Sequence, residues 1–438
     1  MEWQWALLLL IGSSVALMLM GIPVALAFFG TNIIGALIFL GGAKGLEQVA
    51  RNVVEGLVTF SLSPIAMFVL MGEIMFQTGV AMRAVNAIDK LISRVPGRLA
   101  IVAVVSGTVF SALSGSSVAN TALMGTTLMP EMQRRGYHLN LAMGPILGTG
   151  GLAMLIPPSS MAVLLGSLSG ISIAGILIGS AVPGFILAVT YVAFITVRCR
   201  LNPSLAPGYE VERRPLWQRL RPFLIYVVPL LSLFVVVVGS ILAGLATPTE
   251  SAALGAIAAL IAAAGYRSLT WQGLRKALVE SGKITVMIYF IIAASLTFSQ
   301  ILSFSGATTG FLKMMQTIEA TPVMLVFGMM MIVLLMGCFL DPVSIMLITL
   351  PFFMPTLQFA GIDPIWFGIL LLLGLEIGQI TPPFGMILFA MKGIAPPAIT
   401  MRQVYVAAGP YILIEISLLI FLIFVPQTVT WLPALLRN

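Results

Sequence analysis

The sequence predicts an all-α polytopic membrane protein built from two inverted repeats, and three observations support this. The first is composition: of 438 residues, 59% are hydrophobic and 8% are charged, whereas a soluble domain carries about 25% charged residues. The second is a series of apolar windows of roughly 20 residues, each long enough to cross a bilayer as a helix. The third is a match between the two halves of the chain.

The apolar windows occur from one end of the chain to the other. The first of them, from Trp5 to Met20, has no basic leader and no small-residue cleavage site after it, so we expect a helix and not a signal peptide. Clear examples elsewhere are 22–40, 222–243, 284–302 and 404–426.

Basic residues are concentrated between two long apolar windows. Positive charge beside membrane helices marks the cytoplasmic side, so we expect the segment 198–221 to be a cytoplasmic loop between the two halves. This distribution, more than the net charge of +7, indicates the partner: a lipid bilayer and no nucleic acid. The basic residues of the loop are Arg198, Arg200, Arg213, Arg214, Arg219 and Arg221.

Counting outward from this loop predicts about ten full crossings and two re-entrant hairpins, with both termini outside the cytoplasm. The stretch 99–133 must enter and leave on the cytoplasmic side, because it is bracketed by Arg94, Arg98, Arg134 and Arg135. The stretch 321–359 has few charges and a central break, and we expect it to enter from outside.

The predicted organisation has six segments. They are N-terminal scaffold helices (1–61), a first repeat with an arm, hairpin and broken helix (62–197), the basic loop (198–221), a scaffold helix pair (222–283), a second repeat of the same plan (284–427) and a C-terminal tail (428–438).

The two repeats match each other at an offset of 225 residues. Matched Pro-Pro pairs make chance identity in an apolar chain a poor explanation. Inverted repeats with discontinuous helices are typical of secondary transporters, which bind substrate where the repeats meet. The matched positions include Pro130 and Pro355, Gly136 and Gly361, Leu147 and Leu372, Pro157 and Pro382, Pro158 and Pro383, and Met161 and Met386.

Several classes of function are disfavoured by what the chain lacks. His138 is the only histidine, and the two cysteines are far apart, so zinc sites and histidine-based catalytic triads are excluded. No Gly-rich nucleotide loop is present. An intramembrane enzyme would need a nucleophile and base, or metal ligands, converging at depth. A channel would have no need of four matched breaks.

Two breaks interrupt the first repeat. A Ser-Gly-Ser-Ser turn at 114–117, followed by Asn120, permits a sharp reversal, and the helix after it directs free N–H groups into the membrane. Packing of small residues between helices is the alternative. The second break, at 148–160, contains a Pro-Pro pair that frees carbonyl groups to bind a hard cation such as Na⁺; a simple kink is the alternative.

Two breaks interrupt the second repeat. Asp341 aligns with Ser116, and it either binds a cation or caps the helix that begins at Pro342. Glu376 aligns with Gly151, and it is a ligand, a proton carrier or a hydrogen-bonded structural residue. Thr381, directly before the second Pro pair, is the better candidate ligand.

These breaks supply two overlapping sets of candidate residues. The candidate Na⁺ ligands are Ser114, Ser116, Asn120, Gly148, Thr149, Pro157, Gly337, Cys338, Asp341, Gly378, Thr381 and Pro382. The candidate substrate contacts are Gly115, Ser116, Ser117, Asn120, Ser159, Asp341, Pro342, Thr381 and Pro383.

At the four breaks the chain resembles the large membrane subunit of TRAP transporters, the tripartite ATP-independent periplasmic transporters of the DctM type. The resembling segments are 114–120 (SGSSVAN), 156–159 (IPPS), 341–342 (DP) and 378–383 (GQITPP). The resemblance covers nearly the whole chain, and the paired motifs are more specific than either one alone.

The resemblance implies an elevator-type transporter in the bacterial inner membrane, in which hairpins and broken helices move against a scaffold. It further implies that Na⁺ drives uptake of an organic anion, a carboxylate or sugar acid. A periplasmic binding protein of the DctP type would deliver the anion, and a separate four-helix subunit of the DctQ type would brace the scaffold. A stand-alone ion-coupled anion symporter of similar architecture is the alternative.

Overall fold

The computed structural model describes residues 2–58, 62–92, 95–207, 215–317 and 320–435, apart from the side chains of 112–114. Within these residues all regular structure is helical, which confirms the predicted fold class. Arg94, Arg213 and Arg214, used above to orient the chain, lie outside the described residues.

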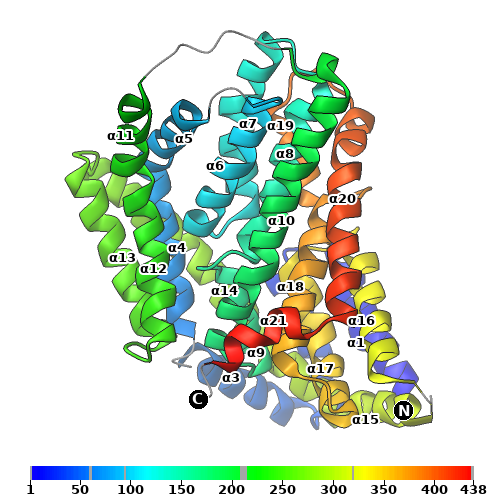
Figure 1. Ribbon diagram of the computed structural model, residues 1–438. Helices are drawn as coiled ribbons and strands as arrows, with labels where there is room; N and C mark the ends of the chain where they lie inside the picture. The colour runs from blue at the N-terminus through cyan, green and yellow to red at the C-terminus, as the bar shows by residue number, and fades with distance from the viewer. Residues whose placement is uncertain (1, 59–61, 93–94, 208–214, 318–319, 436–438) are drawn as a thin grey trace.

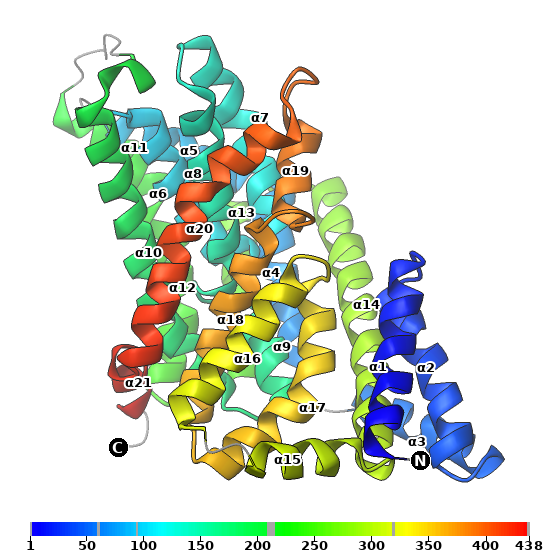
Figure 2. The same ribbon diagram turned by 90° about the vertical axis from the view of Figure 1, so that its right-hand side faces the viewer.

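Four helices open the chain. Helix α3 is amphipathic and lies across the end of the bundle that carries both termini, whereas α1, α2 and α4 run along the bundle (Figures 1 and 2). Their bounds are α1 Trp3–Leu19, α2 Val24–Phe39, α3 Ala43–Val58 and α4 Ser63–Gln77.

The first repeat contains an arm, a hairpin and a broken helix. The hairpin of α6 and α7 opens toward the top of Figure 1 and turns within the bundle, as predicted for 99–133. The elements are α5 Val80–Leu91, α6 Arg98–Ser114, α7 Ser117–Arg134, α8 Leu139–Gly151, the 3₁₀ turn η2 Leu152–Met154, α9 Ser160–Ser169 and α10 Ile173–Leu201.

The middle of the chain is a group of scaffold helices. After the short turn η3 (Pro203–Leu205), α11 and α12 form one bent pair, and a capping box of Thr247 and Glu250 starts α13. The long helix α14 then packs on α2, α3 and α4. The helices are α11 Leu216–Tyr226, α12 Val228–Leu242, α13 Pro248–Gly265 and α14 Trp271–Phe304.

The second repeat has the plan of the first in the opposite orientation. Its hairpin of α16 and α17 opens toward the bottom of both views, so the two hairpins enter from opposite ends (Figures 1 and 2). This confirms the inverted repeat. The elements are α15 Ala307–Thr317, α16 Pro322–Gly337, α17 Pro342–Ala360, α18 Pro364–Ile380, α19 Met386–Ile394, α20 Met401–Phe424 and α21 Gln427–Ala434.

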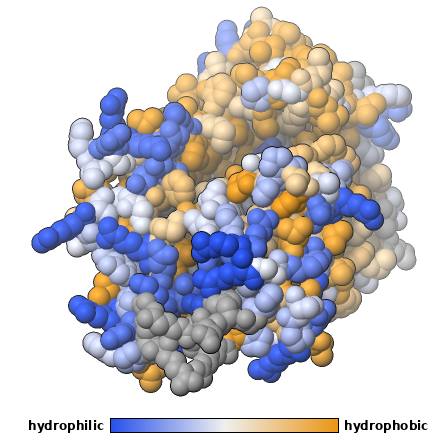
Figure 3. Space-filling model, turned by 90° about the horizontal axis from the view of Figure 1, so that it is seen from above, coloured by the Kyte–Doolittle hydropathy of each residue, from blue (hydrophilic) through white to orange (hydrophobic). Residues whose placement is uncertain are grey.

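The two ends of the bundle differ in polarity. Figure 3 looks onto the end opposite the termini and shows hydrophilic side chains gathered there, beside orange hydrophobic surface. The connections α7–α8 and α19–α20 lie at this end, as do the end of α10 and the start of α11 (Figure 2). The positive-inside rule predicts that this is the cytoplasmic end; α1 begins and α21 ends at the other one.

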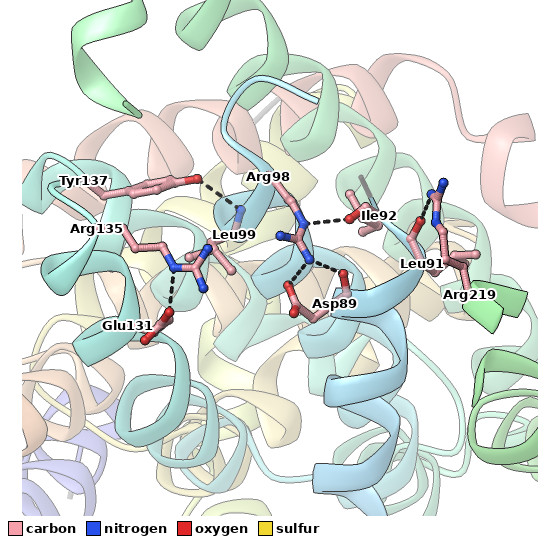
Figure 4. Close-up of polar contacts among 9 residues, drawn as sticks. All are labelled: Asp89, Leu91, Ile92, Arg98, Leu99, Glu131, Arg135, Tyr137 and Arg219. Carbon is pink, nitrogen blue, oxygen red and sulfur yellow. Dashed lines mark hydrogen bonds and ion pairs between the residues drawn. The ribbon is translucent and has the colours of Figure 1, made fainter. Parts of the chain in front are cut away.

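Polar contacts at this end join the arm to the first hairpin and to the scaffold (Figure 4). Arg98 of α6 pairs with Asp89 of α5 at 2.8 Å, and Arg219 of α11 donates to the carbonyl of Leu91. Burial raises the pKa of the Asp89 carboxyl, and the neighbouring Arg98 opposes that shift. These contacts hold α5 between the hairpin and the scaffold.

Helix length alone does not settle the number of crossings. Five described helices are long and apolar enough to span a membrane, and two bent pairs bring the number to seven; several apolar helices are shorter. The count of about ten therefore stays a prediction. Four predicted segment boundaries, at 197/198, 221/222, 283/284 and 427/428, fall inside α10, α11, α14 and α21, so the six-segment division also stays a prediction.

Candidate functional site: two hairpin tips at two helix breaks

The tip of the first hairpin is tied to the broken helix of its own repeat. The chain reverses at Gly115, whose φ of 58° lies in the left-handed region that favours glycine. Ser116 then caps α7, its Oγ accepting from the Ala119 N–H at 3.3 Å. The Gly115 carbonyl accepts from Ser160 Oγ at 3.2 Å, so the tip meets the start of α9. The side chain of Ser114 lies outside the described residues.

Asn120, one turn beyond the tip, connects the hairpin to α8. Its Nδ2 donates to the Thr149 carbonyl and to Ser111 Oγ, each at 2.7 Å. The side chain is fully buried, and its Oδ1 has no partner among the described residues. A buried amide oxygen without a donor is costly unless a ligand satisfies it, which makes Asn120 the candidate ligand that the geometry supports best.

The tip of the second hairpin is held by a carboxylate cap. Asp341 accepts from the Val343 N–H at 3.0 Å, from the Ser344 N–H at 3.1 Å, and also from the Ser344 hydroxyl. Pro342 is the first residue of α17, a position that suits proline. The capping interpretation of Asp341 is thus confirmed, and direct cation binding by its side chain stays a prediction.

The second tip packs closely on α18. A Cβ atom built on Gly337 would lie 2.6 Å from the Cα of Gly378, so the backbones of α16 and α18 touch and neither position can carry a side chain. Next to them, Cys338 directs its sulfur at the Leu334 carbonyl, 3.4 Å away. The candidate ligands Gly337, Cys338 and Gly378 therefore lie together.

The helix breaks lie later in the chain than the sequence predicted. Helix α8 continues through Gly151 and α18 through Ile380, and the irregular backbone occupies 155–159 and 381–385. The prediction that the glycine cluster 148–151 and residues 376–380 belong to the breaks was wrong. Glycine at a packed helix interface keeps its helical hydrogen bonds, whereas proline removes a donor and clashes with the preceding turn.

The candidate hydroxyl ligands lie where the two long helices end: Thr149 in the last turn of α8, and Thr381 directly after α18. Thr149 Oγ1 donates to the Pro145 carbonyl at 2.8 Å, and Thr381 Oγ1 to the Ile377 carbonyl at 2.6 Å. Each keeps lone pairs for a ligand. In contrast, Ser159 caps α9, its Oγ accepting from the Ala162 N–H at 3.3 Å.

Equivalent positions of the two repeats touch each other in the centre. A Cβ built on Gly151 would lie 2.4 Å from Cγ of Glu376, and Gln379 Nε2 lies 3.9 Å from the sulfur of Met154. Both pairs are related by the 225-residue offset. Residues related by a two-fold rotation can touch only near its axis, so the pseudo-two-fold axis passes between α8 and α18.

The short helices α9 and α19 connect the two repeats around this centre. Helix α19 packs on α7, where Gly125 faces Ile394, and α9 packs on α17. Each short half-helix thus contacts the hairpin of the other repeat, while each hairpin tip meets the break of its own repeat. The predicted site residues are brought together in two groups, one at each tip.

A buried polar cluster lies beside this centre, and the sequence analysis identified only one of its two carboxylates. Glu376 of α18 and Glu415 of α20 are both fully buried, and Tyr191 Oη donates to Glu415 Oε1 at 2.5 Å. The other three carboxyl oxygens have no partner among the described residues. Sequence reasoning singled out Glu376 and missed Glu415, although a carboxylate in the apolar window 404–426 was a usable signal.

Comparison with known proteins identifies the family. The family model described as "Tripartite ATP-independent periplasmic transporter, DctM component" matches residues 11–428. The chain is 31% identical, over 97% of its length and 98% of the relative's, to the 2,3-diketo-L-gulonate TRAP transporter large permease protein YiaN of Escherichia coli. It is 32% identical to the C4-dicarboxylate TRAP transporter large permease protein DctM of Pseudomonas aeruginosa, over 91% and 92% of the two chains.

Two solved transporters share the fold. The YdaH transporter of Alcanivorax borkumensis superposes with a TM-score of 0.64 at 15% identity, covering 91% of each chain. MtrF of Neisseria gonorrhoeae superposes with a TM-score of 0.63 at 15% identity, covering 87% of this chain and 84% of that one. With its whole-length match to the family model, the chain belongs to the DctM family, the large permease subunits of TRAP transporters, and it is a membrane transport protein and not an enzyme.

Proposed function

We propose that this permease imports an organic anion together with Na⁺ by an elevator movement. The observation that carries the proposal is the meeting of two oppositely oriented hairpin tips with two helix breaks around one pseudo-two-fold axis. Inverted repeats with discontinuous helices are the recurrent architecture of secondary transporters.

The proposed Na⁺ sites are one at each tip. In the first repeat we assign ligands among Ser116, Asn120 and Thr149, because the buried Asn120 Oδ1 has no partner among the described residues. In the second repeat we assign backbone carbonyls near Gly337 and Thr381 Oγ1. Oxygen-rich sites of this kind suit hard cations.

The proposed substrate is a carboxylate or sugar acid. Helices α7 and α17 both begin at a hairpin tip inside the bundle, and N-terminal N–H groups favour anions. Two relatives carry organic acids by name, 2,3-diketo-L-gulonate and C4-dicarboxylates. Ectoine, in the name of a third relative at 29% identity, widens the class.

The proposed assembly has three parts and lies in the bacterial inner membrane. A periplasmic binding protein delivers the anion, and a small four-helix membrane subunit supports the scaffold. Helices α6–α9 and α16–α19 form the moving block, which crosses the bilayer against α1–α4 and α11–α14.

The test is uptake into proteoliposomes containing the permease and its small subunit, with binding protein and substrate outside. Uptake should require an inward Na⁺ gradient and should stop when K⁺ replaces Na⁺. Undiminished uptake in K⁺ would refute Na⁺ coupling. Uptake that persists without the binding protein would instead support a stand-alone symporter, and omission of the small subunit tests the third partner.

A further inference from the structure

A large apolar cavity lies between the first helix and the second hairpin. Its volume is about 1080 Å³, and residues of α1, α15, α16 and α17 line it. Figure 2 shows α1 and α17 side by side, with α15 crossing below them. The described residues around it include no charged side chain. It thus separates an N-terminal scaffold helix from the hairpin that carries Asp341.

Apart from Gln4, Thr349 and the indole groups of Trp3 and Trp5, the side chains that line the cavity are apolar. Leu8 of α1 and Leu335 of α16, on opposite walls, expose 60% and 63% of their surfaces. The hydroxyl of Thr349, one of the few polar groups there, already donates to the Ile345 carbonyl at 2.7 Å. A water molecule needs two to four polar partners, and an empty space forfeits dispersion contacts. The occupant must therefore be apolar.

We propose that this cavity binds the acyl chains of a membrane phospholipid. In a bilayer, acyl chains are the apolar material that surrounds the exposed leucines of both walls. The volume is slightly above the roughly 300–1,000 Å³ of pockets for drug-sized ligands, which suits a two-chain lipid. Trp3 lines the end of the cavity near the N-terminus, and tryptophan favours the membrane–water interface, so the headgroup lies at that end.

The bound lipid contacts only one of the two hairpin tips. Phe339 and Leu340 line the cavity and directly precede the cap Asp341. The corresponding tip of the first hairpin is instead tied to protein, through Ser160 and Gly115. Acyl chains in the cavity therefore pack against the turn of the second hairpin and restrict its movement.

The test uses the purified full-length chain in bilayers containing phosphatidylethanolamine with a photoreactive group in one acyl chain. Labelled peptides are mapped by mass spectrometry. We compare the parent with a filled variant, Leu8→Trp plus Leu335→Trp, and with a matched control, Leu26→Trp plus Leu37→Trp on α2, where the two leucines are 51% and 48% exposed outside the cavity.

Labelling of the segment 335–340 should fall about tenfold in the filled variant, the change expected for a loss of one decade in affinity, and should be unchanged in the control. Equal labelling in all three proteins would mean unspecific surrounding lipid and would overturn the proposal. A second result would also overturn the proposal: the small subunit, when present, abolishes lipid labelling of the segment 335–340 and is itself cross-linked to that segment. Equal thermal unfolding temperatures of the filled and control variants exclude misfolding as the cause.

Discussion

The two helix breaks share a backbone plan but sit in different surroundings. In both, a long helix ends shortly before a Pro-Pro pair with a cis peptide bond. Residues 155–159, the irregular backbone of the first break, are all buried. In the second, Pro383 is exposed and Phe384 exposes 55% of its surface. One break is thus enclosed by protein and the other is open.

Side chains at equivalent positions have also diverged. Gly151 in one repeat corresponds to Glu376 in the other, and the carboxylate fills the space that the glycine leaves. Ser116 and Asp341 cap equivalent half-helices, with one and two backbone N–H groups respectively. The repeat therefore preserves backbone geometry, while the acidic groups are confined to the second half of the site.

The largest expected effect comes from filling the contact on the pseudo-two-fold axis. Gly151→Leu places a side chain where Glu376 already lies, so we expect loss of folded protein. Overpacking a core costs roughly 1–3 kcal/mol or more. Fluorescence-detected size-exclusion chromatography measures the folded fraction. Gly151→Ala combined with Glu376→Gly should recover folding relative to Gly151→Ala alone; failure of that rescue would show that the two positions are not in contact.

If the proposed cation sites, one in each repeat, are both used, transport is electrogenic. With two Na⁺ and a monoanion, one net positive charge enters, and the membrane potential contributes about 2.3 kcal/mol per 100 mV. Each 1.4 kcal/mol is a factor of ten, so accumulation should change by roughly 50-fold. The measurement is uptake into proteoliposomes with an imposed K⁺ diffusion potential. If uptake of a monoanionic substrate does not respond to the membrane potential, only one Na⁺ is transported with each anion.

The two caps should differ in importance. Asp341→Ala removes a carboxylate that satisfies two backbone N–H groups, and Ser116→Ala removes a hydroxyl that satisfies one. Loss of a cap costs about 0.5–2 kcal/mol, and we expect the higher value for Asp341, with uptake reduced about tenfold and folding retained. Initial uptake rates normalised to folded protein provide the comparison. If both variants fold and take up substrate at the rate of the parent protein, the hairpin tips do not form part of the transport site.

The smallest effect should come from the open break. Tyr405 Oη donates to the Pro383 carbonyl at 2.8 Å at an exposed position. Tyr405→Phe removes one hydrogen bond that water can replace, so we expect a change of about 0.5–1.5 kcal/mol at most. Asn120→Leu removes buried hydrogen bonds from the first hairpin to the last turn of α8, next to the enclosed break, so it should destabilise more in the same thermal unfolding assay. The reverse order would contradict the contrast between the breaks.

The sequence by itself determined the architecture. Apolar windows defined helices, arginine positions oriented them, and the repeated Pro-Pro pairs located both broken helices. The cap at Asp341 was among the interpretations that the sequence offered, because a cap depends on the few residues beside it. These features are local or periodic, so a single sequence carries them.

Tertiary structure decided the rest, because it depends on residues far apart in the chain. Gly151 and Glu376 align by offset, but only the folded bundle shows that they touch. The hydrogen bond between Tyr191 and Glu415 joins two helices 224 residues apart. The exact ends of α8 and α18 followed from packing that keeps glycines helical. The apolar cavity exists only because α1 lies beside a hairpin that comes more than 300 residues later in the chain.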